Sequence, residues 1–180
     1  MNGSETIRLT PEDVALVTRV AVARQQYHTA RGGQHRGENL DPIGNAILGY
    51  LCEMGAARIL GAEFHADVNG DRDRPDVVGI EIRGVTQPWH KLLVSQIDLD
   101  KGHGNRLFVL ATRERNDITL IGGCYGHEAK SLGTVMPDKY SQRDPMTGEV
   151  KTVWGVPQYR LAPWLTLKPQ ILATMAKNPT

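Results

Sequence analysis

The stretch RPDVVGIEIRG, residues 74–84, places three charged side chains inside a run that is otherwise typical of a buried strand. Glu81 and Arg83 are two residues apart, so on a strand they lie on the same face. Asp76 precedes Glu81 by an odd number of residues, which puts its side chain on the opposite face of a regular strand. Gly79 predicts a β-bulge at this point, because glycine tolerates the backbone conformation of a bulge. The extra residue of a bulge would return Asp76 to the face of Glu81.

Two carboxylates on one face of a bent strand repel each other, and apolar surroundings increase that cost unless a proton or a cation neutralises them. The pattern therefore favours a hard divalent cation. Mg²⁺ takes oxygen ligands in an octahedron and keeps several waters, so two or three carboxylates and a backbone carbonyl suffice. Arg83 would place a permanent positive charge beside the ion, where it could hold a phosphate oxygen. The competing interpretation is a strand whose charged face is simply solvated.

Outside this stretch, the sequence divides into helical and strand-like segments. Thr10 and Pro11 start a helix that is expected to end near Ala30. Asp41 and Pro42 start a second helix, which Gly61 ends. Short β-rich runs follow. The expected strands are AEFHADV (62–68), DVVGIEIRGV (76–85), KLLVSQIDL (91–99), RLFVLAT (106–112) and ITLIGGCYG (118–126).

The connections and the C-terminal part complete this outline. DKGHGN, residues 100–105, is typical of a hairpin loop, residues 127–133 suggest a helical turn, and residues 136–150 suggest a long loop. Residues 159–176 predict an extended piece followed by a short helix. The expected fold class is α/β: one domain, residues 1–180, with two N-terminal helices packed on a mixed sheet of about five strands and a short C-terminal helix.

Glu53 lies on the second predicted helix, one step from its apolar stripe, where a carboxylate must lean outward or find a partner. Pro-Asp at 75–76, then Glu-Ile-Arg at 81–83, after a helix bearing Glu53, resembles the PD-(D/E)XK nuclease superfamily. The resemblance is to its compact form, in which the aspartate and the E-x-K lie on one bulged strand. It covers residues 10–125 in element order. It implies a restriction-endonuclease-like core and a metal-dependent phosphodiesterase.

The resemblance also implies roles for individual residues. Arg83 stands where the family has lysine, and arginine keeps its proton at any workable pH, so it can act only electrostatically. Lys91, at the start of the following strand, could supply the amine instead, because the family relocates this residue. The implied catalytic residues are Asp76, Glu81, Arg83 and Lys91. The implied ligands of Mg²⁺, or of Mn²⁺ in its place, are Glu53, Asp76, Glu81 and the backbone carbonyl of Ile82.

A basic cluster suggests how nucleic acid could be bound. Arg24, Arg31 and Arg36 lie at the end of the first predicted helix and in the polar loop after it. Arginines in such positions contact phosphates and position a nucleic acid without reading its sequence. His90 lies close to the proposed site along the chain and is a further candidate for phosphate contact. The alternative is a solvated helix end.

Bulk properties restrict the class of protein. The chain has 180 residues and a formal net charge of +1, which excludes a strongly basic nucleic-acid coat and leaves a local patch as the route to nucleic acid. Cys52 and Cys124 lie in a predicted helix and a predicted strand, as expected of reduced core thiols in a cytoplasm. No signal core or membrane-length apolar run occurs. No zinc motif is present, and residues 67–78 lack the glycine and glutamate of a calcium loop.

The residues and the resemblance together predict a Mg²⁺-dependent DNA endonuclease. The resemblance to small phage-encoded members implies a role in DNA processing, recombination or degradation in the cytoplasm of a host cell. No membrane partner is expected, and the sequence does not indicate an oligomeric state. The alternative is a catalytically inactive nuclease-fold protein that binds DNA or serves as an accessory factor. A third possibility is an interaction protein that ignores nucleic acid.

Overall fold

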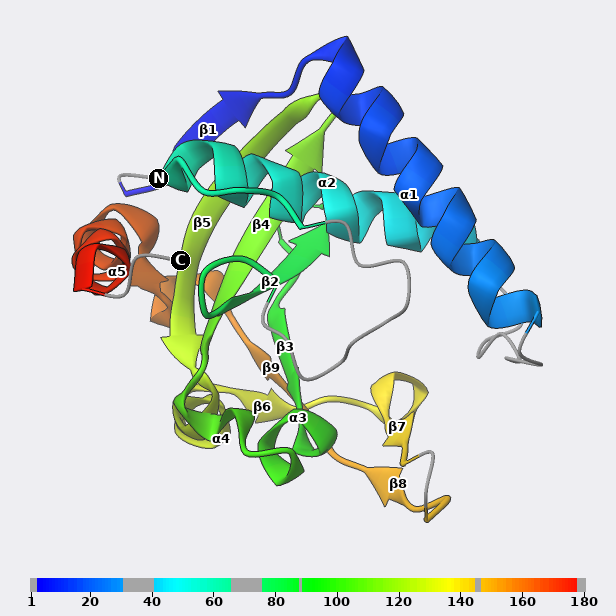
Figure 1. The fold of residues 1–180 in the computed structure, drawn as a ribbon. Helices are drawn as coiled ribbons and strands as arrows, with labels where there is room; N and C mark the ends of the chain where they lie inside the picture. Colours follow the sequence, from blue (N-terminus) through cyan, green and yellow to red (C-terminus); the bar gives the residue numbers. More distant parts are fainter. Residues whose placement is uncertain (1–2, 31–40, 66–75, 88, 145–146, 178–180) are drawn as a thin grey trace.

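The chain folds into an α/β structure with two N-terminal helices, a mixed sheet and a C-terminal helix, as the sequence predicts (Figure 1). The computed structural model describes residues 3–30, 41–65, 76–87, 89–144 and 147–177. The helices are α1 (Pro11–Ala30), α2 (Pro42–Leu60), α3 (Gln96–Asp100), α4 (Ala129–Leu132) and α5 (Trp164–Lys177). The strands are β1 (Glu5–Arg8), β2 (Ile80–Val85), β3 (Leu92–Ser95), β4 (Leu107–Glu114), β5 (Asp117–Tyr125), β6 (Thr134–Val135), β7 (Gln142–Arg143), β8 (Val150–Lys151), β9 (Val153–Val156) and β10 (Ala162–Pro163).

Local capping signals set the ends of the two N-terminal helices. At the start of α1, the Thr10 hydroxyl accepts the amide of Asp13 and the Asp13 carboxylate accepts the amide of Thr10, both at 3.2 Å. The α2 helix starts at Asp41, whose side chain accepts the amide of Ile43, and ends at Gly61 with φ of 66°. The predicted bounds of both helices are confirmed.

The main sheet has the strand order β1-β5-β4-β2, with β10 pairing to β5 beside this path. The β2 and β4 strands are parallel, while β4-β5, β1-β5 and β10-β5 are antiparallel, so the sheet is mixed. The β2 strand lies at the edge of the sheet. A second sheet has the order β3-β9-β6, and β7 pairs with β8 in a hairpin.

The main sheet buries both of its faces. Along β4, Leu107, Val109 and Ala111 point into a core shared with α1, α2 and α5, whereas Phe108 and Leu110 point into a second core. The second core is closed by the β3-β9-β6 sheet. Figure 1 shows α2 running across the main sheet with α1 beside it. The sheet therefore lies between a helical layer and a smaller sheet, and one edge of β2 has no strand partner among the described residues.

Several predicted elements differ from the structure. Residues 62–65 are not in a strand, and residues 66–68 lie outside the described part of the chain. The run 91–99 is a strand only as far as Ser95, which caps α3 in a reciprocal capping box with Asp98. Residues 100–105 are not a hairpin loop, because β3 pairs with β9 and not with β4. The segment 136–150 includes the paired strands β7 and β8, and β1 was not predicted.

Cys52 and Cys124 are buried, free thiols in α2 and β5, as the sequence predicts. Burial raises the pKa of each thiol to about 12, so neither is a nucleophile near neutral pH. Within the described part of the chain, no helix has the length and apolar character needed to cross a membrane.

Candidate active site

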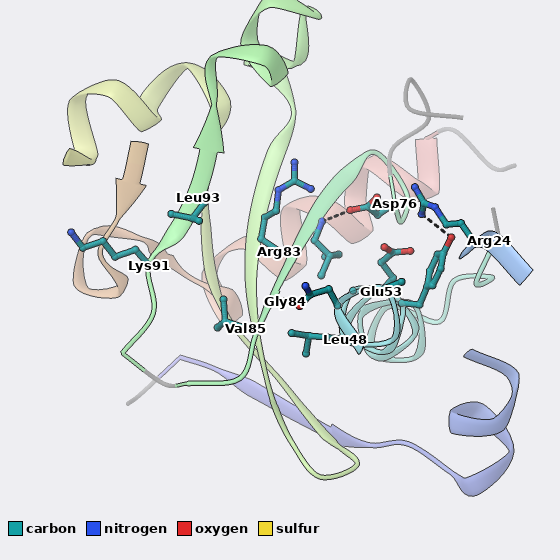
Figure 2. Close-up of a pocket in the computed structure, with 14 residues that line it drawn as sticks. Arg24, Leu48, Glu53, Asp76, Arg83, Gly84, Val85, Lys91 and Leu93 are labelled. Atoms are coloured by element: carbon teal, nitrogen blue, oxygen red, sulfur yellow. Dashed lines mark hydrogen bonds between the residues drawn. The ribbon is translucent and has the colours of Figure 1, made fainter. Parts of the chain in front are cut away.

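A cavity of about 480 Å³ opens between α2 and the free edge of β2 (Figure 2). It contains most of the residues that the sequence singled out, contributed by α1, α2, the segment before β2, β2 itself and β3. The lining residues are Arg24, Asn45, Ala46, Leu48, Gly49, Tyr50, Glu53, Asp76, Ile82, Arg83, Gly84, Val85, Lys91 and Leu93.

A tight turn before β2 brings Asp76 to this cavity. Val77 and Ile80 exchange backbone hydrogen bonds of 3.2 and 2.9 Å across the turn. Val78 and Gly79 have φ angles of 45° and 82°, the positive pair of a type I′ turn. The prediction of a bulge at Gly79 is therefore wrong. The chain makes a turn there, which glycine permits, and the residues before the turn lie beside the start of β2. A positive φ at a β-branched valine is strained, which marks this turn as one that the surrounding fold enforces.

The reversal places the Asp76 carboxylate against the free edge of β2. Its Oδ2 accepts the backbone amide of Ile82 at 2.7 Å. In an extended strand the N–H and the C=O of one residue point to the same side, so the carbonyl oxygen of Ile82 faces the side on which Asp76 lies. A carboxylate and a backbone carbonyl thus lie on the same side of the strand, at the edge of the sheet.

Glu53 reaches the same cavity from α2, which packs closely on β2. At Gly84, a Cβ atom would lie 2.8 Å from the Cys52 sulfur and 3.3 Å from the carbonyl oxygen of Leu48, so only glycine permits this approach. Glu53 follows Cys52 in α2 and is held at the strand edge by that packing. Figure 2 shows the Glu53 and Asp76 carboxylates pointing into the same space.

The electrostatics of the pair reflect this proximity. Burial, together with the charge of Asp76, raises the pKa of Glu53 to about 8. Burial, together with the charge of Glu81, raises the pKa of Asp76 to about 6, although the Ile82 amide counters the shift. The positive charges of Arg24 and Arg83 lower both pKa values, but both remain above the ordinary values of these carboxyl groups. Burial is therefore the main cause of both shifts, and the charges of neighbouring carboxylates add to it.

Arg24 is brought to the cavity by α1. Its Nη1 donates to the Tyr50 hydroxyl at 2.7 Å, and its guanidinium lies 5.5 Å from the centre of the same ring. Arg24 was predicted as a nucleic-acid contact from its place at the end of the helix; the structure puts it beside the two carboxylates (Figure 2). Tyr50 was not predicted as part of the site, and its position on the buried side of α2 gave no such signal.

Glu81 and Arg83 lie on one face of β2, as their spacing predicts, and form a charged network there. The Glu81 carboxylate accepts Arg106 Nη1 at 2.5 Å and lies 3.6 Å from Arg83 Nη1. Arg83 Nη2 also bonds Asp98 at 3.3 Å, and its guanidinium lies 5.2 Å from the Phe108 ring centre. Glu81 is thus buried against two arginines, and Arg83 alone of this network lines the cavity.

Arg106 and Asp98 were missed in the sequence, although signals for both exist. Asp98 ends the capping signature Ser-Gln-Ile-Asp at 95–98, which marks the start of α3. Arg106 is two residues before Phe108, which pairs with Glu81 in the parallel ladder, so both side chains lie on one face. That inference requires knowing that β2 and β4 are neighbours, which the sequence does not state.

The remaining expected residues are not brought to the carboxylates. Lys91 lines the cavity, but its ammonium donates to Thr134 Oγ1 at 3.1 Å and points away from Glu53 and Asp76 in Figure 2. His90 is exposed in the turn before β3 and does not line the cavity. Arg31 and Arg36 lie outside the described residues.

The described residues contain no group of three or more His, Cys, Asp or Glu side chains arranged to hold a metal ion by themselves. A metal at this cavity would therefore need backbone oxygen and water ligands besides the carboxylates. Comparison with known proteins gives no assignment: no family model, no curated protein and no solved structure matches the chain.

Proposed function

We propose that the chain is a Mg²⁺-dependent nuclease that hydrolyses phosphodiester bonds in DNA and has a restriction-endonuclease-like core. The observation that carries this proposal is the contact of Asp76 with the amide of Ile82 at the edge of β2, in a cavity shared with Glu53. This contact sets two carboxylates and a backbone carbonyl around one space. A parallel β2-β4 pair beneath two helices is compatible with the proposed core.

The donor set fits a hard divalent cation. Asp76, Glu53 and the Ile82 carbonyl offer only oxygen, which Mg²⁺ prefers, and waters would supply its remaining ligands. The raised pKa values of both carboxyls also support a cation, because a bound cation would offset the burial and the carboxylate charges that raise them. When bound, Mg²⁺ would lower the pKa of a water for attack and neutralise charge on the phosphate. Glu81 was expected as a metal ligand, but it does not line the cavity and its carboxylate is paired with Arg106 and Arg83, so it would influence the site only through its charge.

Arg83 and Arg24 supply positive charge to the cavity. Asp98 and Glu81 hold the Arg83 guanidinium from two sides, which fixes it in place. A fixed guanidinium can bind a phosphate oxygen and stabilise charge that develops on it. It cannot accept a proton, so deprotonation of the attacking water falls to a carboxylate or to solvent. Asp76 and Glu53 are the carboxylates available in the cavity.

The rival proposal is a catalytically inactive DNA-binding or accessory protein with the same fold. One observation favours it: ion pairs link Arg106, Glu81, Arg83 and Asp98 in a continuous chain, as expected of side chains that stabilise the fold. The position of the Lys91 ammonium beside Thr134 also leaves the carboxylates without a nearby amine from that residue.

Cleavage of labelled DNA separates the two proposals. The purified chain is expected to cut DNA with Mg²⁺ or Mn²⁺, to stop in EDTA, and to lose activity as Asp76→Asn with an unchanged far-UV circular dichroism spectrum. Asp117→Asn is the matched control, because Asp117 forms a surface ion pair with Arg8 at the far edge of the sheet. DNA binding without cleavage under either metal would favour the rival. Undiminished cleavage by Asp76→Asn would reject the site.

A further inference from the structure

A surface of exposed aromatic and cationic side chains begins beside the cavity. Trp89 and Tyr159 are 73% and 83% exposed, the highest values among the large hydrophobic side chains of the described residues. Their segments are far apart in sequence but joined, because Gln158 Nε2 donates to the carbonyl oxygen of His90 at 3.2 Å. We call this surface the aromatic rim; it consists of Trp89, His90, Lys91, Gln158, Tyr159 and Arg160.

The aromatic rim is continuous with the cavity through Lys91. The aliphatic stem of this lysine lines the cavity and lies over β9, where its Cδ would be 2.9 Å from a Cβ at Gly155. Its ammonium then reaches Thr134. Lys91 therefore belongs both to the rim and to the lining of the cavity that holds Glu53 and Asp76.

The charge of the rim suits a polyanion. No Asp or Glu occurs in residues 82–97 or 150–180, the two stretches from which the rim is built. Arg160 lies 5.9 Å from the centre of the Tyr159 ring and donates to the carbonyl oxygen of Leu132, so its charge is fixed beside the aromatic face. Cations that lie among exposed aromatic rings are the arrangement by which proteins hold single strands, through phosphate contacts and base stacking.

A second cavity, of about 370 Å³, adjoins Tyr159. Its walls are mostly apolar, with the Ser4 and Gln158 side chains as polar groups, and its volume is within the range of small-molecule sites. A nucleobase can enter such a space only when it is unpaired and unstacked. The lining residues are Gly3, Ser4, Ile121, Gln158, Tyr159, Leu161 and Pro163.

We infer that the aromatic rim binds single-stranded DNA, with bases stacked on Trp89 and Tyr159 and phosphates beside Lys91 and Arg160. The inference deepens the proposed function and rests on it for the identity of the nucleic acid. It gives the substrate class: an unpaired strand, or an unpaired end of a duplex, led into the cavity that holds Glu53 and Asp76. Duplex DNA conceals the base faces that the rim requires.

Fluorescence anisotropy with a short labelled oligothymidine, in EDTA, tests this inference without cleavage. Trp89→Ala and Tyr159→Ala are each expected to weaken binding at least about fivefold, since stacking on an aromatic side chain is worth that factor or more. Tyr125→Ala is the control, because Tyr125 is a 39% exposed aromatic residue at the end of the main sheet where β2 begins and is not one of the rim residues. Unfolding temperatures verify that the exposed substitutions leave the fold intact.

Equal affinity of the wild type and both variants for the oligothymidine would overturn the inference, as would tighter binding of a blunt duplex than of the single strand. Failure of the proposed function has a different signature. In that case the variants still weaken oligothymidine binding, while the wild type does not cleave DNA with Mg²⁺ or Mn²⁺.

Discussion

Glu53→Gln removes a carboxyl group whose protonated form is favoured in the folded protein. In the unfolded chain this carboxyl has a pKa of 4.5, and in the folded chain burial and Asp76 raise the pKa to about 8. As the pH rises from about 4.5 to 8, the unfolded state loses the proton first, so the free energy of unfolding falls through that window. Below pH 4.5 the carboxyl is protonated in both states and has no such effect.

The size of the effect follows from the same two values. At pH 7 the pH is roughly 2.5 units above the pKa of this carboxyl in the unfolded chain, and each unit corresponds to about 1.4 kcal/mol. Ionisation of the carboxyl in the unfolded chain therefore lowers the free energy of unfolding by about 3 kcal/mol. Glutamine has the same shape and cannot ionise. We therefore expect Glu53→Gln to be more stable than the wild type by up to about 3 kcal/mol at pH 7, with the difference vanishing near pH 4.5.

Urea denaturation at a series of pH values between 4.5 and 8 measures this difference. Glu114→Gln, at the exposed end of β4, serves as a control that is expected to follow the wild type. Saturating Mg²⁺ at pH 8 is expected to narrow the gap, because an ion that binds the folded carboxylates stabilises the wild type selectively. A Glu53→Gln protein that is no more stable than the wild type at any pH would refute the electrostatic account of the cavity.

Three further predictions concern the elements that build the site. Asp13→Ala is expected to cost about 1–3 kcal/mol in urea denaturation, because it removes the carboxylate that accepts the Thr10 amide at the start of α1 and that bonds Arg58 of α2 at 2.6 Å; an unchanged midpoint would contradict that. Gly84→Ala is expected to cost about 1–3 kcal/mol, since its Cβ would meet the Cys52 sulfur, and a neutral effect would show that α2 lies farther from β2. Gly79→Ala is expected to lower the thermal unfolding temperature and the affinity for Mn²⁺ more than Gly79→Asn, because asparagine tolerates a positive φ better; equal effects would argue against the turn.

The bounds of the two N-terminal helices could be predicted because their signals are local. Asp41, Pro42 and Gly61 mark the ends of α2 by chemistry that acts within one turn of the helix. The partner of β3 could not be predicted in that way, since it pairs with β9, which lies more than fifty residues later in the chain. Strand pairing between distant segments leaves no signal in either segment alone.

The site was predicted in part for the same reason. The spacing of Glu81 and Arg83 fixed their common face, and Gly79 marked a backbone irregularity before them. Whether that irregularity was a bulge or a reversal depended on Val78 adopting a positive φ, against the preference of valine. The engagement of Glu81 by Arg106 depended on the parallel pairing of β2 with β4, which is again non-local.

The central claim is that the turn before β2 brings Asp76 to the edge of the strand. There, Asp76, Glu53 and the Ile82 carbonyl form a binding site for a divalent cation. Anomalous diffraction from crystals soaked in Mn²⁺ tests it most directly. We expect one peak about 2 Å from an Asp76 carboxylate oxygen and from the Ile82 carbonyl oxygen, absent in Asp76→Asn. A cavity without a peak, or a peak that persists in Asp76→Asn, would contradict the claim.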